Sequence, residues 1–380
     1  MAKAKLEAGM TFGGFVLKQL LHTGGMAQLW QVTPEHSSEV LLMKVPVLAE
    51  GEDPATIVGF EMEQMIMPRL KGPHVPRFIA NGDFAVQPFI VMEKIDGESL
   101  LPKLTSLPLP VPEVVEIGRK VAVALDALHR QRVVHLDIKP SNIMMRSTGE
   151  AVLVDFGLSR HLDLPDLVAE EFRLPYGTAP YMAPEQILGQ RHDFRSDFFA
   201  LGALLYFFAT GERPFGDPPR LKGLKRRLWW DPPPPRMLNR DIPLWLQEVI
   251  LRCLEVNASR RYPNAQQLLF DLNNPSEVKL TKRAHKERPD GFFVRLKRKS
   301  EPFESLIDHP KDASEGLGQA PIIAVAIDLA TMSPELSEQV RQTVMRIVER
   351  SKEVRVACLN VLKLKRLALD STLDEEGNNK

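Results

Sequence analysis

The stretch "VVHLDIKPSNIMM" at residues 133–145 places His135, Asp137, Lys139 and Asn142 between two pairs of apolar residues. The apolar pairs predict a loop that is anchored in the core at both ends. Between them, Asp137 can accept or orient a proton, and Lys139 can neutralise developing negative charge. Asn142 offers an uncharged oxygen ligand for a hard cation. The stretch therefore predicts a loop with catalytic chemistry, although capping of a turn is the commoner role of a single Asp or Asn.

A second stretch, "VLVDFGLS" at 152–159, places Asp155 directly after an apolar strand. Gly157 follows two residues later and permits an unusual backbone turn. Carboxylate and amide oxygens are the ligands that Mg²⁺ prefers in proteins. Asp155 and Asn142 together therefore predict a magnesium site.

A lysine in an apolar strand gives a third signal. Lys44 stands in "LLMKV" at 41–45, where the usual role of a lysine is to extend its charge past a sheet edge into solvent. The alternative is a cation held for a phosphate or a carboxylate. Glu63 supplies such a carboxylate on the helix that follows, while Glu61 lies on a different face of that helix.

Two glycines lie at the tip of a predicted hairpin in "LLHTGGMAQLWQV", residues 20–32. Without a Cβ, Gly24 and Gly25 allow backbone N–H groups to approach a ligand closely, as a phosphate site requires. A glycine pair between two strands is more often just a turn.

The order of these motifs is typical of one family. A glycine hairpin, a strand lysine, a helix glutamate, H-x-D-x-K-x-x-N and D-F-G form the protein-kinase signature set. Residues 12 to about 272 resemble the bacterial, eukaryotic-like serine/threonine protein kinases. Three further stretches extend the match: "YGTAPYMAPEQ" (176–186), "SDFFALGALLYFFATGERPF" (196–215) and "NASRRYPNAQQLL" (257–269).

This resemblance implies an α+β, two-lobed protein kinase fold, with a small β-rich N-terminal lobe and a larger helical C-terminal lobe. It also implies transfer of the γ-phosphoryl group of ATP to Ser or Thr hydroxyls of proteins. Lys44 would hold the α- and β-phosphates and would be oriented by Glu63. Asp137 would accept or align the substrate hydroxyl proton, with Lys139 beside the transferred group.

Asn142 and Asp155 would hold Mg²⁺, with Mn²⁺ as an alternative ion. His135 is expected to pack near the D-F-G turn rather than to act as a base. The residues expected to surround ATP are Gly24, Gly25, Met26, Ala27, Lys44, Met92 at the gatekeeper position, and the backbone of Glu93 and Ile95. Those expected to support the activation segment are Thr178, Glu185, Asp197 and Arg261, of which Arg261 would pair with Glu185.

Two departures from the family concern the nucleotide and the regulation. His22 and Ala27 replace the first and third glycines of the phosphate loop, and His22 is expected to weaken or reshape nucleotide binding. Leu136 stands where the family usually has an arginine that pairs with a phosphorylated activation-loop residue, and leucine has no charge to offer.

The activation loop itself agrees with this loss. Between Ser159 and Tyr176 the sequence has no Ser, Thr or Tyr. Four acidic residues supply permanent negative charge instead: Asp163, Asp166, Glu170 and Glu171. We therefore expect that activity does not require phosphorylation of the activation loop. The main alternative to an enzyme is a pseudokinase that binds nucleotide as a scaffold or regulator.

The bulk composition excludes some partners. Lysine plus arginine and aspartate plus glutamate number 49 each in 380 residues, so no overall basic field for nucleic acid exists. Cys253 and Cys358 are far apart, which fits a reducing compartment better than a disulfide framework. The apolar run at 198–210 is too short to cross a bilayer, and residues 1–10 lack the apolar stretch of a secretory signal. We expect a cytoplasmic protein without a membrane partner.

The remaining chain suggests a second unit. "PIIAVAIDLA" (321–330), a predicted helix and "EVRVACLNVLK" (353–363) form a βαβ pattern. It resembles the start of the universal stress protein fold, with Asp328 either contacting a nucleotide or merely ending a strand. A βαβ unit cannot bury both faces of a sheet alone, so truncation or a homodimer through this segment would complete it. The predicted division is 1–95 for the N-terminal lobe, 96–272 for the C-terminal lobe, 273–318 for a linker and 319–380 for this partial α/β segment.

Overall fold

The computed structural model of the chain describes residues 6–24, 27–47, 54–82, 87–171, 175–218 and 220–291. Further described pieces are 294, 298–299, 322–327, 333, 336, 338–340, 342–344 and 355–360. Contacts divide the chain into two units, Met1–Asp308 and His309–Lys380, which are considered separately. Gly25, Met26 and Asp328 lie outside the described residues.

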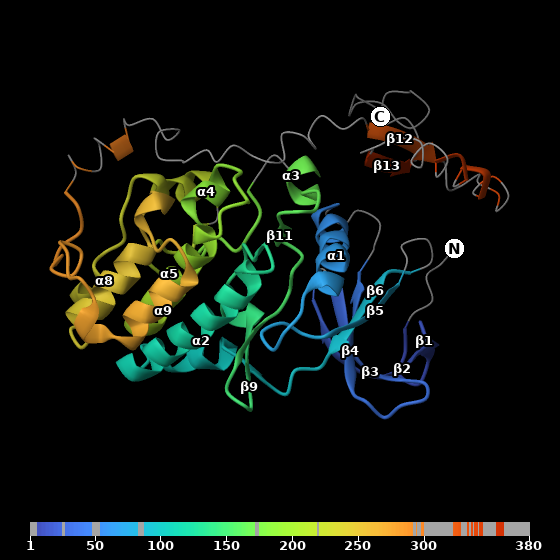
Figure 1. Cartoon of the computed structure of the whole chain (residues 1–380), viewed down its shortest axis with the longest axis horizontal. Coiled ribbons are helices and arrows are strands. Elements are labelled where there is room, and N and C mark those ends of the chain that lie inside the picture. Colours follow the sequence, from blue (N-terminus) through green and yellow to red (C-terminus); the bar gives the residue numbers. More distant parts are fainter. Residues whose placement is uncertain are drawn as a thin grey trace, which may run out of the picture. The chain divides into compact units, whose positions relative to one another are not determined.

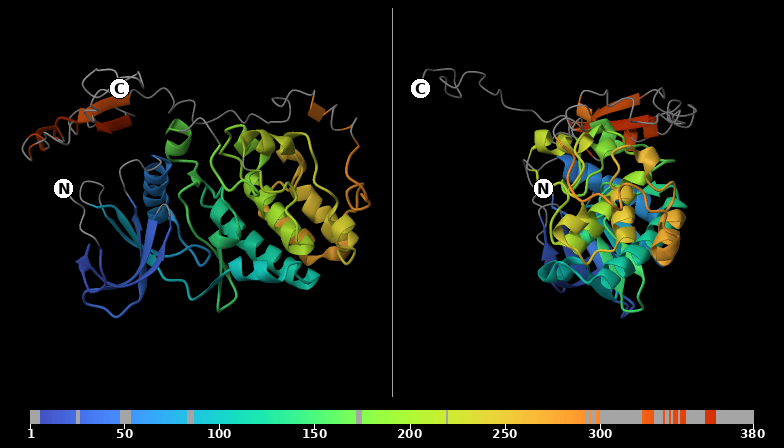
Figure 2. Two further views of the ribbon diagram at one scale, coloured as in Figure 1. Left: turned by 180° about the vertical axis from the view of Figure 1, so that it is seen from behind. Right: turned by 90° about the vertical axis from the view of Figure 1, so that its left-hand side faces the viewer.

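A six-stranded antiparallel sheet forms the small lobe of the first unit (Figures 1 and 2). In spatial order its strands are β1 (Thr11–Phe12), β2 (Phe15–Thr23), β3 (Ala27–Pro34), β4 (Leu41–Pro46), β6 (Phe89–Glu93) and β5 (Phe78–Gly82). Side chains alternate between the two faces of a strand. Met43 and Val45 are buried in one core of this lobe, so Lys44 between them points to the other face.

Helix α1 (Pro54–Ile66) belongs to the same lobe and carries Glu63. Phe60, Met62 and Ile66 are buried, and the Gln64 side chain donates hydrogen bonds to the carbonyls of Gly82 and Phe89 at the end of the sheet. The predicted β-rich lobe with one helix is confirmed.

The large lobe is helical (Figure 1). Its main helices are α2 (Val111–His129), α5 (Arg195–Thr210), α8 (Leu244–Cys253) and α9 (Ala265–Asn273). Its shorter ones are η2 (Leu101–Ser106), η3 (Pro140–Asn142), α3 (Leu167–Glu171), α4 (Pro184–Ile187), α6 (Leu221–Leu224), η4 (Lys225–Leu228), α7 (Pro235–Leu238), η5 (Ala258–Arg260) and η6 (Pro275–Glu277), with η1 (Met67–Arg69) following α1. The predicted helical lobe is confirmed. No helix in the described part of the chain is both long and apolar enough to span a membrane.

Short strands position the two motif stretches. The loop at 135–142 connects β8 (Val133–Val134) to β9 (Ile143–Arg146), and Asp155 follows β10 (Ala151–Leu153). β9 pairs antiparallel with β10 and with β7 (Gly97–Ser99), while β8 pairs with β11 (Arg160–His161). Because β9 and β10 are paired, the end of the catalytic loop lies beside the residues that lead to Asp155.

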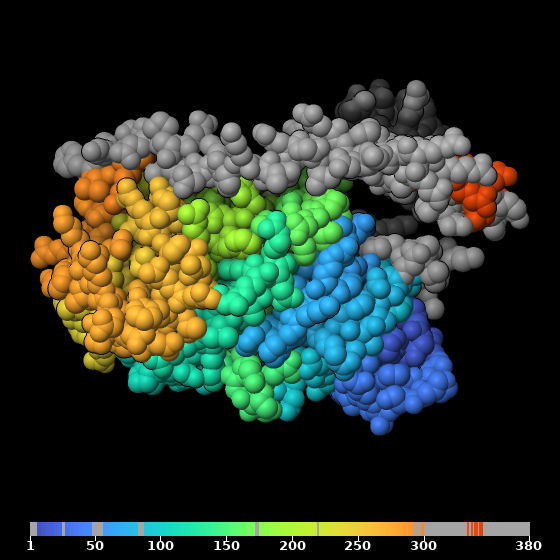
Figure 3. Space-filling view, in the orientation of Figure 1, coloured from blue at the N-terminus to red at the C-terminus, as the bar shows by residue number. Residues whose placement is uncertain are grey.

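The described residues 274–291, which follow α9, lie at the beginning of the predicted tether at 273–318 and make buried contacts with the large lobe. The buried side chain of Gln247 donates hydrogen bonds to the carbonyls of Arg283, Ala284 and Lys286 at 2.8–3.0 Å. The buried carboxylate of Glu248 accepts bonds from the backbone N–H groups of Thr281 and Ala284, each at 3.0 Å. Figure 3 shows the orange atoms of this segment against the yellow atoms of the large lobe. The polar, aperiodic sequence predicts a solvated tether, but buried side chains of α8 satisfy its backbone groups instead.

In the second unit, β12 (Ile322–Ile327) and β13 (Arg355–Asn360) pair in parallel, with Ile322 opposite Arg355 and Ile327 opposite Asn360. Residues 336, 338–340 and 342–344 between them are helical.

Candidate active site

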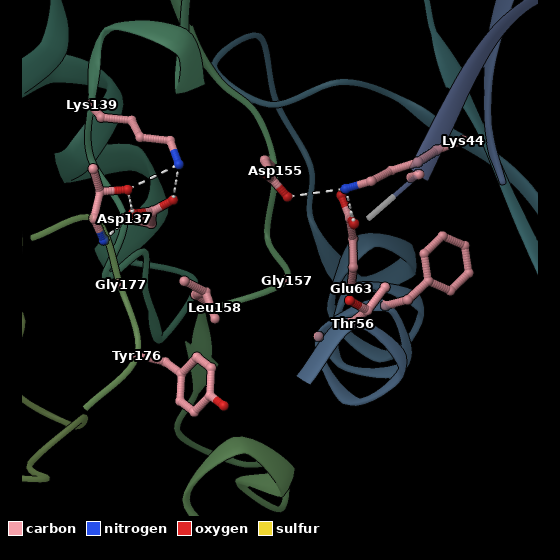
Figure 4. A pocket seen from close by; sticks show the side chains of 14 residues that line it. Lys44, Thr56, Glu63, Asp137, Lys139, Asp155, Gly157, Leu158, Tyr176 and Gly177 are labelled. Carbon is pink, nitrogen blue, oxygen red and sulfur yellow. Dashed lines mark hydrogen bonds and ion pairs between the residues drawn. The ribbon is translucent and has the colours of Figure 1, made fainter. Parts of the chain in front are cut away.

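Lys44 forms ion pairs with two carboxylates that come from distant parts of the sequence. Its Nζ lies 2.6 Å from Oε2 of Glu63 and 3.0 Å from Oδ1 of Asp155. The Glu63 side chain is 1% exposed, and the backbone N–H of Phe156 donates to its second oxygen at 3.4 Å. The sheet, α1 and the D-F-G turn are therefore joined at one cation, as Figure 4 shows.

The electrostatics of this group favour the charged forms of Lys44 and Asp155. Burial alone favours the neutral amine, but the charges of Asp155 and Glu63 outweigh it and raise the pKa of Lys44 above its ordinary value. The Lys44 charge lowers the pKa of Asp155 to about 2. Burial raises the pKa of Glu63, and the ion pair with Lys44 only partly offsets that effect. Of these three groups, Glu63 is the one that needs the Lys44 charge to remain ionised.

A second polar cluster surrounds Asp137. One carboxylate oxygen accepts hydrogen bonds from the backbone N–H and the hydroxyl of Thr178, at 3.1 and 2.7 Å. The other lies 2.6 Å from Nζ of Lys139 and 3.0 Å from Nδ2 of Asn142. Lys139 also donates to the Thr178 hydroxyl at 3.0 Å. The carboxylate is therefore fixed from three directions.

Asp197 of α5 holds the backbone of the catalytic loop. Its carboxylate is fully buried and accepts hydrogen bonds from the N–H groups of His135 and Leu136 at 2.9 and 2.8 Å. Leu136 has a φ of +63°, which is unfavourable for a residue with a side chain. The Gln186 side chain donates to the Leu136 carbonyl at 2.9 Å. Buried hydrogen bonds on both sides of the residue hold this conformation.

The His135 ring is fully buried and packs against Phe156, with ring centroids 5.3 Å apart. Its Nε2 lies 3.2 Å from the carbonyl oxygen of Val154. This placement fits the expected structural role beside the D-F-G turn. The Ser159 hydroxyl donates to the His135 carbonyl at 3.1 Å and links the turn to the loop a second time.

Glu185 and Arg261 form a buried ion pair in the large lobe, with contacts of 2.6 and 2.8 Å. The Ser196 hydroxyl donates to the same carboxylate at 2.6 Å, and Arg261 also donates to the backbone carbonyls of Glu255 and Arg195. Two-point contact between arginine and carboxylate is the stronger geometry for such a pair. It anchors the end of the activation segment on α5.

The oxygen ligands expected for magnesium have the right chemistry. Asn142 directs its amide nitrogen to the backbone and side chain of Asp137, so its Oδ1 is the group left for a cation and accepts one bond from Ser141 at 3.1 Å. Asp155 is 46% exposed and uses one oxygen for Lys44. Val154 N–H donates to the Asn142 carbonyl at 3.0 Å, which places the two ligand-bearing segments side by side. One carboxylate and one amide oxygen fit Mg²⁺, which completes its shell with phosphates and water.

The Lys44 group and the Asp137 cluster line one cavity of about 220 Å³, whereas Asn142 is not among its lining residues. Lys44, Glu63, Asp155, Asp137, Lys139, Thr178 and Ala27 of the expected site contribute to it (Figure 4). Gly157, noted for its turn, also lines it, and the sequence did not single out the others: Thr56, Gly59, Phe60, Leu158, Tyr176 and Gly177. Gly157 and Gly177 stand inside motifs already noted, whereas the three residues of α1 carry no local signal.

Of the residues expected around ATP, Ala27 and Lys44 line this cavity, whereas Gly24, Met92, Glu93 and Ile95 do not. Met92 and Ile95 are buried, and the Glu93 side chain pairs with Arg146 at 2.5 Å, which lowers the pKa of Glu93. Gly24 N–H donates to the Ala27 carbonyl at 3.0 Å within the hairpin. Gly25 and Met26, which are expected to contact the phosphates, lie outside the described residues.

Comparisons with known proteins agree with this geometry. Residues 15–271 match the family described as "Protein kinase domain". Serine/threonine-protein kinase PknB of Mycobacterium leprae is 31% identical over 264 residues, which are 68% of this chain and 42% of the relative. Serine/threonine-protein kinase PknD of Mycobacterium tuberculosis is 31% identical over 270 residues, 70% of this chain and 40% of the relative.

The chain thus matches only about two fifths of the length of these curated relatives, 42% and 40%. Among solved structures, the PknI kinase domain of Mycobacterium tuberculosis is 25% identical with a TM-score of 0.55. That match covers 71% of this chain and 99% of the solved one.

Proposed function

This chain belongs to the protein kinase family, and we propose that it is an active serine/threonine kinase that uses ATP and a divalent cation. The observation that supports this most directly is the Lys44–Glu63–Asp155 group facing Asp137 across one cavity. A nucleotide-binding scaffold has no chemical need for Asp137 and Lys139 at the opposite wall. The pseudokinase alternative therefore leaves half of the site unexplained.

The proposed reaction follows from the positions of these groups. Lys44 binds the α- and β-phosphates and Lys139 neutralises charge on the transferred phosphoryl group. The substrate hydroxyl oxygen forms a bond to the γ-phosphorus while the bond to the bridging oxygen of ADP breaks. The hydroxyl proton moves toward Asp137. Positioning and charge neutralisation supply the catalysis, and no covalent enzyme intermediate is needed.

Magnesium would be held by Asn142 and Asp155 and would supply neutralisation of the phosphate charge. Mn²⁺ has similar ligand preferences and can replace it. The low pKa of Asp155, about 2, keeps this ligand ionised at neutral pH. The folded site therefore offers a charged Asp155 carboxylate to the metal ion at all pH values near neutral.

The test is transfer of label from [γ-³²P]ATP with Mg²⁺ to a generic protein substrate, followed by phosphoamino acid analysis. Asp155→Asn is the blank, because it removes a charged ligand without changing the size of the side chain. We expect phosphoserine or phosphothreonine from the native chain alone. Equal signals from the two proteins would exclude the enzyme and leave the scaffold.

We further propose that phosphorylation of the activation loop is not required. Leu136 supplies no charge for a phosphate, and Ser159 is fully buried and bonded to His135. The measurement is the activity of the protein before and after phosphatase treatment, with mass spectrometry of residues 159–178. A large loss of activity that follows dephosphorylation of this segment would contradict the proposal.

We also propose that residues 319–380 form a partial α/β unit separate from the kinase lobes. The parallel pairing of β12 and β13 supports a βαβ unit like the start of a universal stress protein. A βαβ unit cannot bury both faces of its sheet alone, so a second copy of the chain is the proposed partner. The wide spacing of the two cysteines supports a reducing, cytoplasmic location.

A further inference from the structure

Asp166 of the activation segment forms an ion pair with Arg191, and neither residue belongs to the active site described above. Asp166 directly precedes helix α3, and both of its carboxylate oxygens accept hydrogen bonds from Nε of Arg191, at 3.1 and 2.9 Å. One of these oxygens also accepts the N–H of Ala169 at 3.2 Å, as an N-cap residue does. Arg191 lies outside the segment, between α4 and α5.

Burial separates this pair from an ordinary surface contact. The side chains of Asp166 and Arg191 are 14% and 9% exposed, and Nε of Arg160 lies 3.7 Å from the same carboxylate. The neighbouring pair Arg132–Asp163 is 57% and 55% exposed. Exposed pairs contribute little, whereas removal of one partner of a desolvated pair leaves a costly unpaired charge.

Arg191 also reaches the start of the same segment. Its NH2 group donates to the carbonyl of Leu158 at 2.9 Å, and Leu158 directly follows the D-F-G turn. One guanidinium thus fixes both the residue after Gly157 and the residue before α3.

Helix α3 transmits this constraint to the catalytic group. Val168 is 4% exposed and belongs to the main hydrophobic core. The helix packs against α1, which carries Glu63 (Figure 1). A change at Asp166 therefore acts on the Lys44–Glu63 pair through α3 and on Asp155 through Leu158.

We propose that Asp166 is a positioning residue that holds the activation segment in its active arrangement through Arg191 and Arg160. A permanent carboxylate takes the part that a phosphorylated side chain has in other family members. This agrees with the absence of Ser, Thr and Tyr from residues 160–175. The proposal rests on the proposed kinase function for its kinetic readout.

The experiment compares Asp166→Asn with Asp163→Asn in the full chain, by kinetics and by amide hydrogen exchange. Both variants lose one carboxylate of the same loop, so Asp163→Asn is the matched control. For Asp166→Asn we expect kcat/KM for the protein substrate to fall about tenfold or more, as for loss of a buried ionic partner. Exchange in residues 158–171 should become faster. Asp163→Asn should stay within about twofold of the native chain, as for an exposed pair.

Equal kinetics and equal exchange in the two variants would overturn the proposal. If Asp166→Asn does not fold, Arg191→Lys is measured instead, because it retains the charge but loses the second donor to Leu158. Full activity and unchanged exchange in that variant would also overturn it. If the native chain transfers no phosphoryl group, the proposed function fails, while faster exchange in Asp166→Asn alone still supports the positioning role.

Discussion

Gly59 of α1 and Gly157 of the D-F-G turn are in such close backbone contact that a Cβ on either would lie 3.2 Å from the carbonyl oxygen of the other. A glycine inside a helix costs about 0.5–1 kcal/mol relative to alanine. The close approach is a physical reason for a glycine at position 59. Helix α1 must lie near the D-F-G turn so that Glu63 and Asp155 can both contact Lys44.

Gly59→Ala is therefore expected to improve the helix and impair the site. The added methyl group pushes α1 from the turn by a few tenths of an ångström and lengthens the Lys44–Glu63 contact. We expect kcat to fall roughly three- to tenfold, since a misplacement of about 1 Å can cost ~100-fold. The melting temperature of Gly59→Ala should change little, because the gain in helix propensity offsets the strain at the turn.

Gly118→Ala is the control for adding a methyl group inside a helix. A Cβ there would meet the two terminal methyl groups of Leu205 at 3.2 and 3.3 Å, within the large lobe. Its kcat should remain within about twofold of the native value, because no part of the site moves. An equal loss of kcat in both variants would show that the Gly59–Gly157 contact has no special role.

Lys44→Met should destabilise the fold in a pH-dependent way. It leaves the buried Glu63 without its cation, at a cost of about 3–5 kcal/mol when a buried pair is broken on one side. Burial then holds the pKa of Glu63 above its unfolded value, so the folded protein binds more protons than the unfolded chain. The unfolding free energy of this variant should therefore rise as pH falls from neutral toward the ordinary range of a glutamate.

Urea unfolding of the native chain, Lys44→Met and the double variant Lys44→Met, Glu63→Gln between pH 5 and 8 measures this effect. The double variant should regain part of the stability and lose the extra pH dependence. The same slope of stability against pH in both variants would rule out Glu63 as the titrating group.

Arg227 is expected to position the loop at 178–182, which begins at the Thr178 contact with Asp137. Its side chain is 1% exposed, donates to the carbonyls of Met182 and Ala179 at 2.5 and 2.7 Å, and leaves Nε without a partner within the described structure. Burial lowers the pKa of Arg227 to about 10. Arg227→Met removes a costly buried charge but leaves two carbonyl oxygens without their donor, so the two effects on stability oppose each other. KM for the protein substrate should rise by about three- to tenfold, because the loop loses both anchoring bonds.

The matched control is Arg226→Met at the exposed neighbour, whose guanidinium lies 3.8 Å from the ring centre of Trp230. Its KM for the protein substrate should stay near the native value. KM for ATP should be unchanged in both variants. A rise in KM for ATP in Arg227→Met would point to general disruption rather than to the loop at 178–182.

Truncation tests whether residues 274–291, which contact Gln247 and Glu248 of α8, contribute to the stability of the large lobe. A chain that ends at Asn273 should be less stable than one that ends at Gly291. The shorter chain exposes or leaves unpaired the polar groups of Gln247 and Glu248, and each unpaired buried group costs about 1–3 kcal/mol. Denaturant unfolding of the two chains gives the comparison, and equal midpoints would mean that residues 274–291 only lie on the surface.

Local pattern predicted most of the site because the chemistry is concentrated in short motifs. Asp137, Lys139 and Asn142 fall within one loop, and the aliphatic flanks of that loop predict its anchoring. The pairing of Lys44 with Glu63 required only the alternation of a strand and the face of a helix. The contacts of residues 274–291 were not predictable in this way, because Gln247 and Glu248, which bond the backbone at 281–286, give no periodic signal.

The sequence by itself determined the two lobes, the family and the identity of the groups that would handle ATP, since these depend on periodicity and on motifs at fixed spacing. The tertiary structure decided which groups meet. It brought Gly59 against Gly157, and it placed Arg191 on Asp166, contacts between segments whose separation in the sequence carries no local pattern. Whether a carboxylate is an exposed charge or a buried anchor depends on the side chains that exclude water around it, and that is settled only when the chain is folded.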